Sequence, residues 1–296
     1  MTSIFDVEKR LPLKKECERI NKFIINNSFY VTNGYGANLN LYQIVDGFLF
    51  LDWKYRGTAT QINEFLDYFD IDLSKFGYSN HILSDTQYLY YLETLINLLD
   101  LIRVDYSNPY NFKISYSNDS IRGFVESIIE NIDIILQANN FKKYQTKNST
   151  IQFTKRDVDA DSAIITVKER DIALDVLSFL DFRNENSLNE KKSIITRLYK
   201  HLEANQSTYK SIRIKSNANS KDINPYDDFF LLANKFDIRH HPKDLLKNGT
   251  FQKLDDKRTL EVLDICFRLF LRIVNTSQAV IDQDYINNLK QEFNII

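Results

Sequence analysis

Side chains that can do acid–base and phosphate chemistry gather at one place in this sequence, residues 234–241. This run holds two of the chain's four histidines, His240 and His241, together with Arg239, Lys235 and Asn234. Histidine exchanges a proton near neutral pH, and arginine binds a phosphate through two parallel N–H donors. Such a set suits RNA cleavage, in which a base activates the ribose 2′-hydroxyl and an acid protonates the leaving oxygen without a metal ion.

The helix that positions these side chains is predicted to begin at Asn224. Asparagine is a good N-cap, Pro225 suits the first helical position, and Asp227 and Asp228 lie at the positive end of the helix dipole. Apolar residues then recur at three- and four-residue spacing, and Pro242 stops the helix. The apolar residues are Phe229, Leu232, Ala233 and Phe236. The polar cluster is therefore predicted at a helix C-terminus.

A simpler interpretation of the cluster stays open. One of the two histidines would cap the helix end, and the other polar side chains would be solvated. Adjacent residues of a helix point about 100° apart, so His240 and His241 would chelate one metal ion poorly. Arg197 and His201 form a second, shorter arrangement that shares one helix face, and we expect them to be a simple surface pair.

Residues Leu231–His241, flanked by helices, resemble the HEPN superfamily of short helical-bundle domains found in abortive-infection proteins, toxins and RNA-cleaving defence nucleases. A longer stretch, roughly residues 139–293, resembles bacterial and prophage proteins in which a short hairpin precedes the helices. The resemblance implies a metal-independent endoribonuclease or toxin-like effector in phage defence, working as a homodimer. It also implies that His240 is the general base or acid, that Arg239 and Lys235 bind the phosphate, and that Asn234 orients it.

The cluster departs from the usual HEPN ribonuclease motif, which places four to six residues between an arginine and a histidine. Here four residues separate Lys235 from His240. Either lysine replaces the arginine, or Asn234 fills the polar position and Arg239 supplies the charge. Several HEPN-like domains are inactive, so the alternative function is a non-catalytic sensor or regulator that binds a partner protein or a nucleotide. An unknown protein partner or a phage trigger fits either function.

Glycine and proline are scarce, with 7 and 4 in 296 residues, which favours long helices. The sequence lacks a phosphate-binding glycine loop, a nucleophile elbow and zinc-ligand spacing, so we expect no cofactor and no metal. Residues 141–155 alternate around a turn and predict a small β-hairpin. The chain is thus predicted to be all-α, mainly a helical bundle, apart from this hairpin. Further predicted helices cover residues 5–27, 41–55, 60–69, 85–104, 120–138, 161–181, 188–204, 256–274 and 277–293.

Charge and composition suggest two domains, residues 1–140 of unknown role and residues 141–296, the HEPN-like domain with the hairpin. The first carries 12 Lys and Arg against 18 Asp and Glu, and the second 26 against 22. A polyanion such as RNA is therefore expected to bind the second. Cys17 and Cys266 form no redox pattern, and no apolar run suits a signal or membrane segment. We therefore expect a soluble, cytoplasmic protein without membrane contact.

Overall fold

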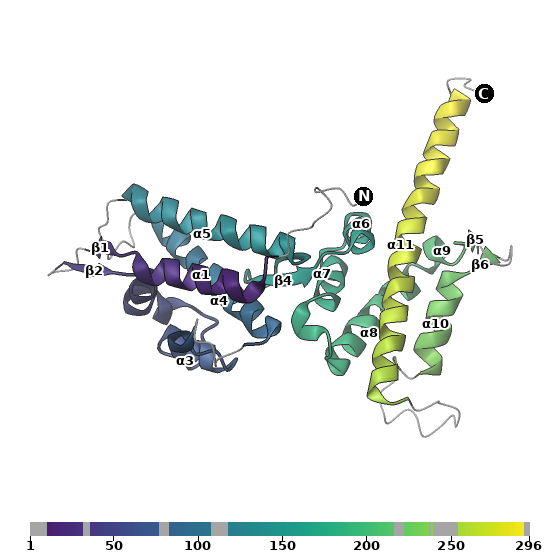
Figure 1. Cartoon of the computed structure of the whole chain (residues 1–296). Helices are drawn as coiled ribbons and strands as arrows, with labels where there is room; N and C mark the ends of the chain where they lie inside the picture. The colour runs from purple at the N-terminus through teal and green to yellow at the C-terminus, as the bar shows by residue number, and fades with distance from the viewer. Residues whose placement is uncertain are drawn as a thin grey trace, which may run out of the picture. The chain divides into compact units, whose positions relative to one another are not determined.

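The computed structural model describes residues 11–31, 36–76, 83–107, 118–215, 222–236, 238 and 254–292. The chain forms two compact units, an N-terminal unit, Met1–Phe153, and a C-terminal unit, Thr154–Ile296 (Figure 1). Each unit has its own helices and its own core, and each is described by itself.

Three long helices pack on one another in the N-terminal unit: α1 (Leu13–Asn26), α4 (Asp85–Ser107) and α5 (Asn118–Ala138). α1 and α5 each bury one apolar stripe at helical spacing. α4 is buried around most of its circumference, which makes it the central helix of this unit. Its buried apolar residues are Tyr88, Leu89, Tyr91, Leu92, Leu95, Ile96, Leu98, Leu99 and Ile102.

Shorter elements complete the N-terminal unit. Strands β1 (Phe29–Val31) and β2 (Ala37–Leu39) pair antiparallel, and α2 (Leu41–Ile44) follows. The predicted helix over residues 41–55 is helical only in part, because α2 passes into a π-helical turn, Val45–Leu49, and a 3-10 turn, Phe50–Asp52. Helix α3 spans Ile62–Asp67, and Leu73–Lys75 form a further 3-10 turn.

The predicted hairpin is confirmed as strands β3 (Phe141–Gln145) and β4 (Ile151–Lys155). Side chains of α4 hold the start of β4. The Asn97 amide accepts from the Ile151 N–H at 2.9 Å and donates to the Ile151 carbonyl at 2.8 Å. The Glu93 carboxylate accepts from the Phe153 N–H at 3.1 Å. These bonds bind residues 151–153 to the N-terminal unit.

The C-terminal unit is built around the long helix α11 (Asp256–Glu292), which packs against α6 (Val158–Thr166), α8 (Leu188–Ala204) and α10 (Pro225–Lys235). Helix α7 (Arg170–Phe179) packs on α8, and α9 (Gln206–Tyr209) and the two-residue strands β5 (Ile214–Lys215) and β6 (Asp222–Ile223) complete the unit. Aromatic residues fill much of its core. Phe179 and Phe267 stack with ring centroids 4.0 Å apart.

The all-α prediction is confirmed, but two predicted helix boundaries are wrong. Residues 161–181 form two helices instead of one, since Lys168 lies between them with φ 53°, outside the right-handed helical region. Residues 256–274 and 277–293 form the single helix α11. The polar residues at the expected break find partners there. The Asn275 amide donates to the Asp159 carbonyl at 2.9 Å, and the Ser277 hydroxyl donates to the Val274 carbonyl at 2.6 Å.

The boundary between the two units falls inside strand β4, between Phe153 and Thr154, whereas the predicted boundary at residue 140 precedes the hairpin. The hairpin residues before this point include three lysines, Lys142, Lys143 and Lys147, and no acid. These lysines supply three of the four net positive charges of the predicted second domain, so the C-terminal unit that begins at Thr154 has a net charge of only +1. In the part of the chain that the structure describes, no helix is both long and apolar enough to cross a membrane.

Candidate functional site

The start of α10 follows the predicted local chemistry. The Asn224 side-chain oxygen accepts from the N–H groups of Tyr226, at 3.1 Å, and Asp227, at 3.3 Å, and Pro225 occupies the first helical position. Phe229 and Ala233 are buried one turn apart. Phe230 lies against Tyr199 of α8, with ring centroids 4.4 Å apart. These contacts fix the helix that leads to the polar cluster.

The end of α10 is tied to α8 through Ile238. The Ile238 N–H donates to the Ala233 carbonyl at 3.1 Å, which closes the last turn. The Ile238 side chain is buried, with 4% of its surface exposed. The Thr196 hydroxyl of α8 donates to two carbonyls, that of Lys192 in its own helix at 2.8 Å and, at the longer distance of 3.2 Å, that of Ile238. The Ile238 carbonyl therefore lies against the surface of α8.

Two lysines flank Thr196 along α8. Lys192 and Lys200 lie one turn before and one turn after Thr196, so all three share one face of the helix. Lys200 is exposed and Lys192 half-exposed. Within the described ranges, neither lysine pairs with a carboxylate. We call Lys192, Thr196 and Lys200 the α8 stripe.

The predicted site residues divide into two groups. Asn234 and Lys235 are exposed in the last turn of α10, and the Lys235 ammonium lies 5.9 Å from the centroid of the Phe236 ring. Arg239, His240 and His241 lie outside the described residues. The structure thus places the start of the cluster and the chain just before the histidines.

Arg197 and His201 have separate partners, so the predicted surface pair is wrong. The Arg197 Nε donates to both carboxylate oxygens of Asp175, at 2.9 and 3.0 Å. His201 is buried, with its ring nitrogens 3.3 Å from the Tyr209 hydroxyl and 3.3 Å from the Glu169 carboxylate. Helix periodicity placed both on one helix, but α7, α9 and α11 determine what each side chain meets.

A cleft of about 480 Å³ lies between α7, α8 and α11 in the C-terminal unit. Its charges compensate one another. Lys191 is bonded to Asp264 at 2.8 Å, and Lys155 to Glu185 at 2.7 Å. The described residues contain no group of three or more metal-ligating side chains. The α8 stripe, whose lysines have no carboxylate partner among the described residues, is the better candidate for binding an anion.

Sequence reasoning missed the α8 stripe and the Thr196–Ile238 bond. The four-residue spacing of Lys192, Thr196 and Lys200 is visible in the sequence, but it is common on solvated helix faces. Only the contact between Thr196 and Ile238, which lie 42 positions apart, distinguishes this face from an ordinary solvated one. The sequence matches no protein-family model, and comparison with curated proteins and with solved structures finds no similar protein.

Proposed function

We propose that this chain is a metal-independent endoribonuclease, a toxin-like effector in phage defence, whose site combines residues 234–241 with the α8 stripe. The observation that supports the proposal is the contact between Ile238 and Thr196, because it brings the chain that leads into Arg239 and His240 to a helix face whose two lysines have no carboxylate partner among the described residues. Lysines on such a face favour a phosphate backbone.

In the proposed reaction, one base accepts the proton of a ribose 2′-hydroxyl, and the 2′-oxygen forms a bond to the adjacent phosphorus. The bond from phosphorus to the 5′-oxygen breaks, and an acid protonates that oxygen, which leaves a 2′,3′-cyclic phosphate. His240 serves as the base or the acid, and Arg239 and Lys235 bind the phosphate. Asn234 orients it. Lys192 and Lys200 hold the neighbouring phosphates.

The test is cleavage of end-labelled RNA by purified protein, with analysis of the product ends. We expect His240→Ala to slow cleavage by about 10²–10⁴-fold, the usual contribution of a general acid or base. Thr196→Val keeps the side-chain shape but removes the hydroxyl that anchors Ile238, so cleavage is expected to fall while RNA affinity changes little.

The matched control for the stripe is an exposed lysine of the N-terminal unit. The double variant Lys192→Gln/Lys200→Gln is expected to weaken RNA binding and to reduce its salt dependence, whereas Lys54→Gln leaves both unchanged. Equal cleavage by wild type and His240→Ala would overturn the nuclease assignment. RNA or nucleotide binding without cleavage would instead support the regulatory binding protein. The proposal includes a homodimer, for which light scattering should give twice the chain mass of 34.9 kDa.

A further inference from the structure

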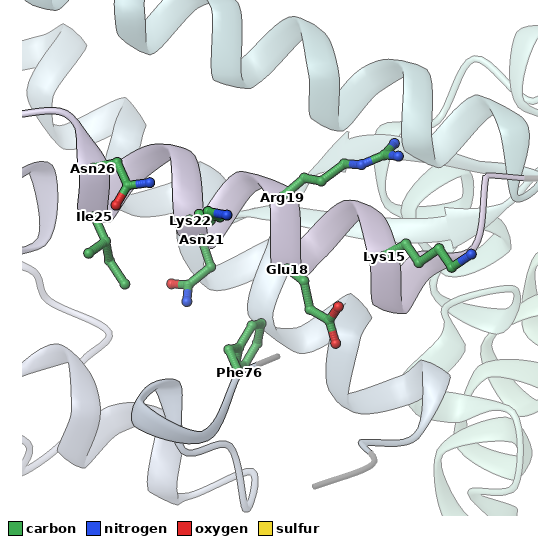
Figure 2. Close-up of a pocket in the computed structure, with 8 residues that line it drawn as sticks. All are labelled: Lys15, Glu18, Arg19, Asn21, Lys22, Ile25, Asn26 and Phe76. Carbon is green, nitrogen blue, oxygen red and sulfur yellow. The ribbon is translucent and has the colours of Figure 1, made fainter. Parts of the chain in front are cut away.

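A groove of about 420 Å³ lies along the outer face of α1 in the N-terminal unit. Its lining comes from one side of this helix and from Phe76 (Figure 2). The opposite side of α1, with Leu13, Cys17, Ile20 and Ile24, is buried in the core. The groove shares no residue with the α8 stripe, so a ligand bound there would serve a second activity. The helix residues that line it are Lys15, Glu18, Arg19, Asn21, Lys22, Ile25 and Asn26.

Asn21 is the polar side chain at the base of this groove, with 5% of its surface exposed. Figure 2 shows it extending from α1 toward the ring of Phe76. Its side-chain oxygen accepts from the Tyr42 hydroxyl at 2.9 Å, and the Tyr42 hydroxyl lies 2.8 Å from the Tyr91 hydroxyl. Across the described residues, the Asn21 amide nitrogen has no hydrogen-bond partner.

The burial of Tyr91 fixes which way this amide points. Tyr91 is 1% exposed, and among described residues its hydroxyl meets only that of Tyr42. A buried hydroxyl proton needs an acceptor, so Tyr91 donates to Tyr42 and Tyr42 donates to Asn21. Burial raises the pKa of both tyrosines well above the ordinary value, which keeps both hydroxyls protonated. The Asn21 oxygen is thereby occupied, and its N–H₂ donors are left for the groove.

The side chains that line the groove carry more positive than negative charge. Three cationic residues and one carboxylate line the groove, which leaves a formal excess of two positive charges. Lys15 and Lys22 are exposed and have no carboxylate partner in the described part of the chain, whereas Arg19 is bonded to Glu16 at 2.6 Å. A phosphate monoester carries about −1.5 to −2 charges at neutral pH, so it is attracted to Lys15 and Lys22.

Apolar surface lies beside the donor and the lysines. The Phe76 ring is half-exposed and supported from behind by Tyr91, with ring centroids 4.8 Å apart. Ile25 is 48% exposed on the same face of α1. A planar ring can lie against Phe76 while a phosphate meets Asn21 and the lysines. The groove volume falls within the range of about 300–1,000 Å³ that is usual for small-molecule sites.

We propose that this groove binds an aromatic phosphate of mononucleotide size, with the phosphate on the Asn21 amide and Lys22 and the ring against Phe76. AMP is a suitable probe, measured by isothermal titration calorimetry on the full chain. Adenosine and inorganic phosphate serve as half-ligands. We expect AMP to saturate one site and each half-ligand to bind at least about tenfold more weakly, since each loses one set of contacts.

Three variants test the geometry. Asn21→Asp retains an acceptor for Tyr42 but turns a donor into a carboxylate, so AMP affinity should fall about 30-fold or more. Lys22 is exposed, so the fold should tolerate Lys22→Gln, and the affinity for AMP should fall about fivefold to tenfold. Lys54→Gln, at an exposed lysine of the same unit that lies outside the groove lining, should leave affinity unchanged.

The outcomes separate clearly. No saturable AMP binding, or equal losses in Lys22→Gln and Lys54→Gln, would overturn the proposal. If inorganic phosphate bound as tightly as AMP, the ring would contribute nothing to binding, and the proposal of an aromatic ligand would be wrong. Because every variant is in the N-terminal unit, RNA cleavage by the same preparations shows separately whether the proposed nuclease activity is intact.

Discussion

At the scale of single residues, Asp181 places a carboxylate in the interior of the C-terminal unit. It is 1% exposed, and Arg183 meets it with three donors. The Arg183 backbone N–H and Nε donate to one carboxylate oxygen at 2.9 and 2.8 Å, and an Nη donates to the other at 2.5 Å. An ion pair of this kind contributes little net stability but is harmful to break, because the remaining charge stays buried.

We therefore expect Arg183→Met to lower the free energy of unfolding by about 3 kcal/mol, since the variant leaves Asp181 without its guanidinium partner. The matched control is Lys155→Met, which breaks the exposed pair with Glu185 and should cost less than about 1 kcal/mol. Urea denaturation followed by circular dichroism measures both. Equal losses in the two variants would show that burial of Asp181 does not determine the cost.

At the scale of elements, helices α8 and α10 begin in different ways. The Asn224 side chain accepts two N–H groups of the first turn of α10, whereas the Ser187 side chain at the start of α8 makes no such bond. α8 is held mainly by burial of one face, with Ile194, Ile195, Leu198 and Leu202 in the core. The shorter α10 depends more on its cap, and α10 in turn carries the Ile238 anchor.

Removing the two caps should therefore have unequal effects. Asn224→Ala is expected to cost about 1 kcal/mol, the usual contribution of an N-cap side chain. Ser187→Ala should cost less than about 0.5 kcal/mol, because no cap bond is lost. Thermal denaturation of the two variants beside wild type checks this. A cost in Ser187→Ala as large as in Asn224→Ala would contradict the assignment of the caps.

At the scale of the whole molecule, each unit contains one buried cysteine. Cys17 lies in the N-terminal core and Cys266 in the C-terminal core. Burial raises the pKa of Cys266 to about 12 and, with the nearby Glu16, raises that of Cys17 well above its usual value. The thiolate is the reactive form, so both side chains are protected twice, by burial and by protonation.

We expect neither cysteine of the native protein to react with a thiol reagent at pH 8, and both to react in denaturant. Since each unit has its own core, Arg183→Met should lower the urea concentration at which Cys266 is labelled and leave that of Cys17 unchanged. Mass spectrometry of the labelled peptides separates the two sites. A parallel shift of both cysteines would show that the units unfold as one.

The raised thiol pKa values also predict a pH dependence. A group that holds its proton more tightly in the folded chain stabilises the fold below its ordinary pKa and loses that contribution as the pH rises through the folded value. The stability contributed by Cys266 should therefore decline between about pH 9 and pH 12. Cys266→Ala should show a smaller decline over this range than wild type, which denaturation at several pH values would reveal.

The sequence by itself determined what depends on neighbouring residues. Helix α8 spans the predicted residues 188–204, Asn224 and Pro225 begin α10 as expected, and the hairpin occupies residues 141–155. Helical period, caps and turn residues act over a few positions, so a single sequence carries them. The same local chemistry predicted that polar side chains follow the end of α10.

Only the tertiary structure decided what depends on distant partners. Asn275 continues α11 because Asp159 lies beside it, and His201 is buried because Tyr209 and Phe270 surround it. The orientation of the Asn21 amide depends on Tyr42 and Tyr91, and the Ile238 anchor depends on Thr196. Such contacts join residues that are far apart in the sequence, and their proximity is a property of the folded chain that the local pattern does not encode.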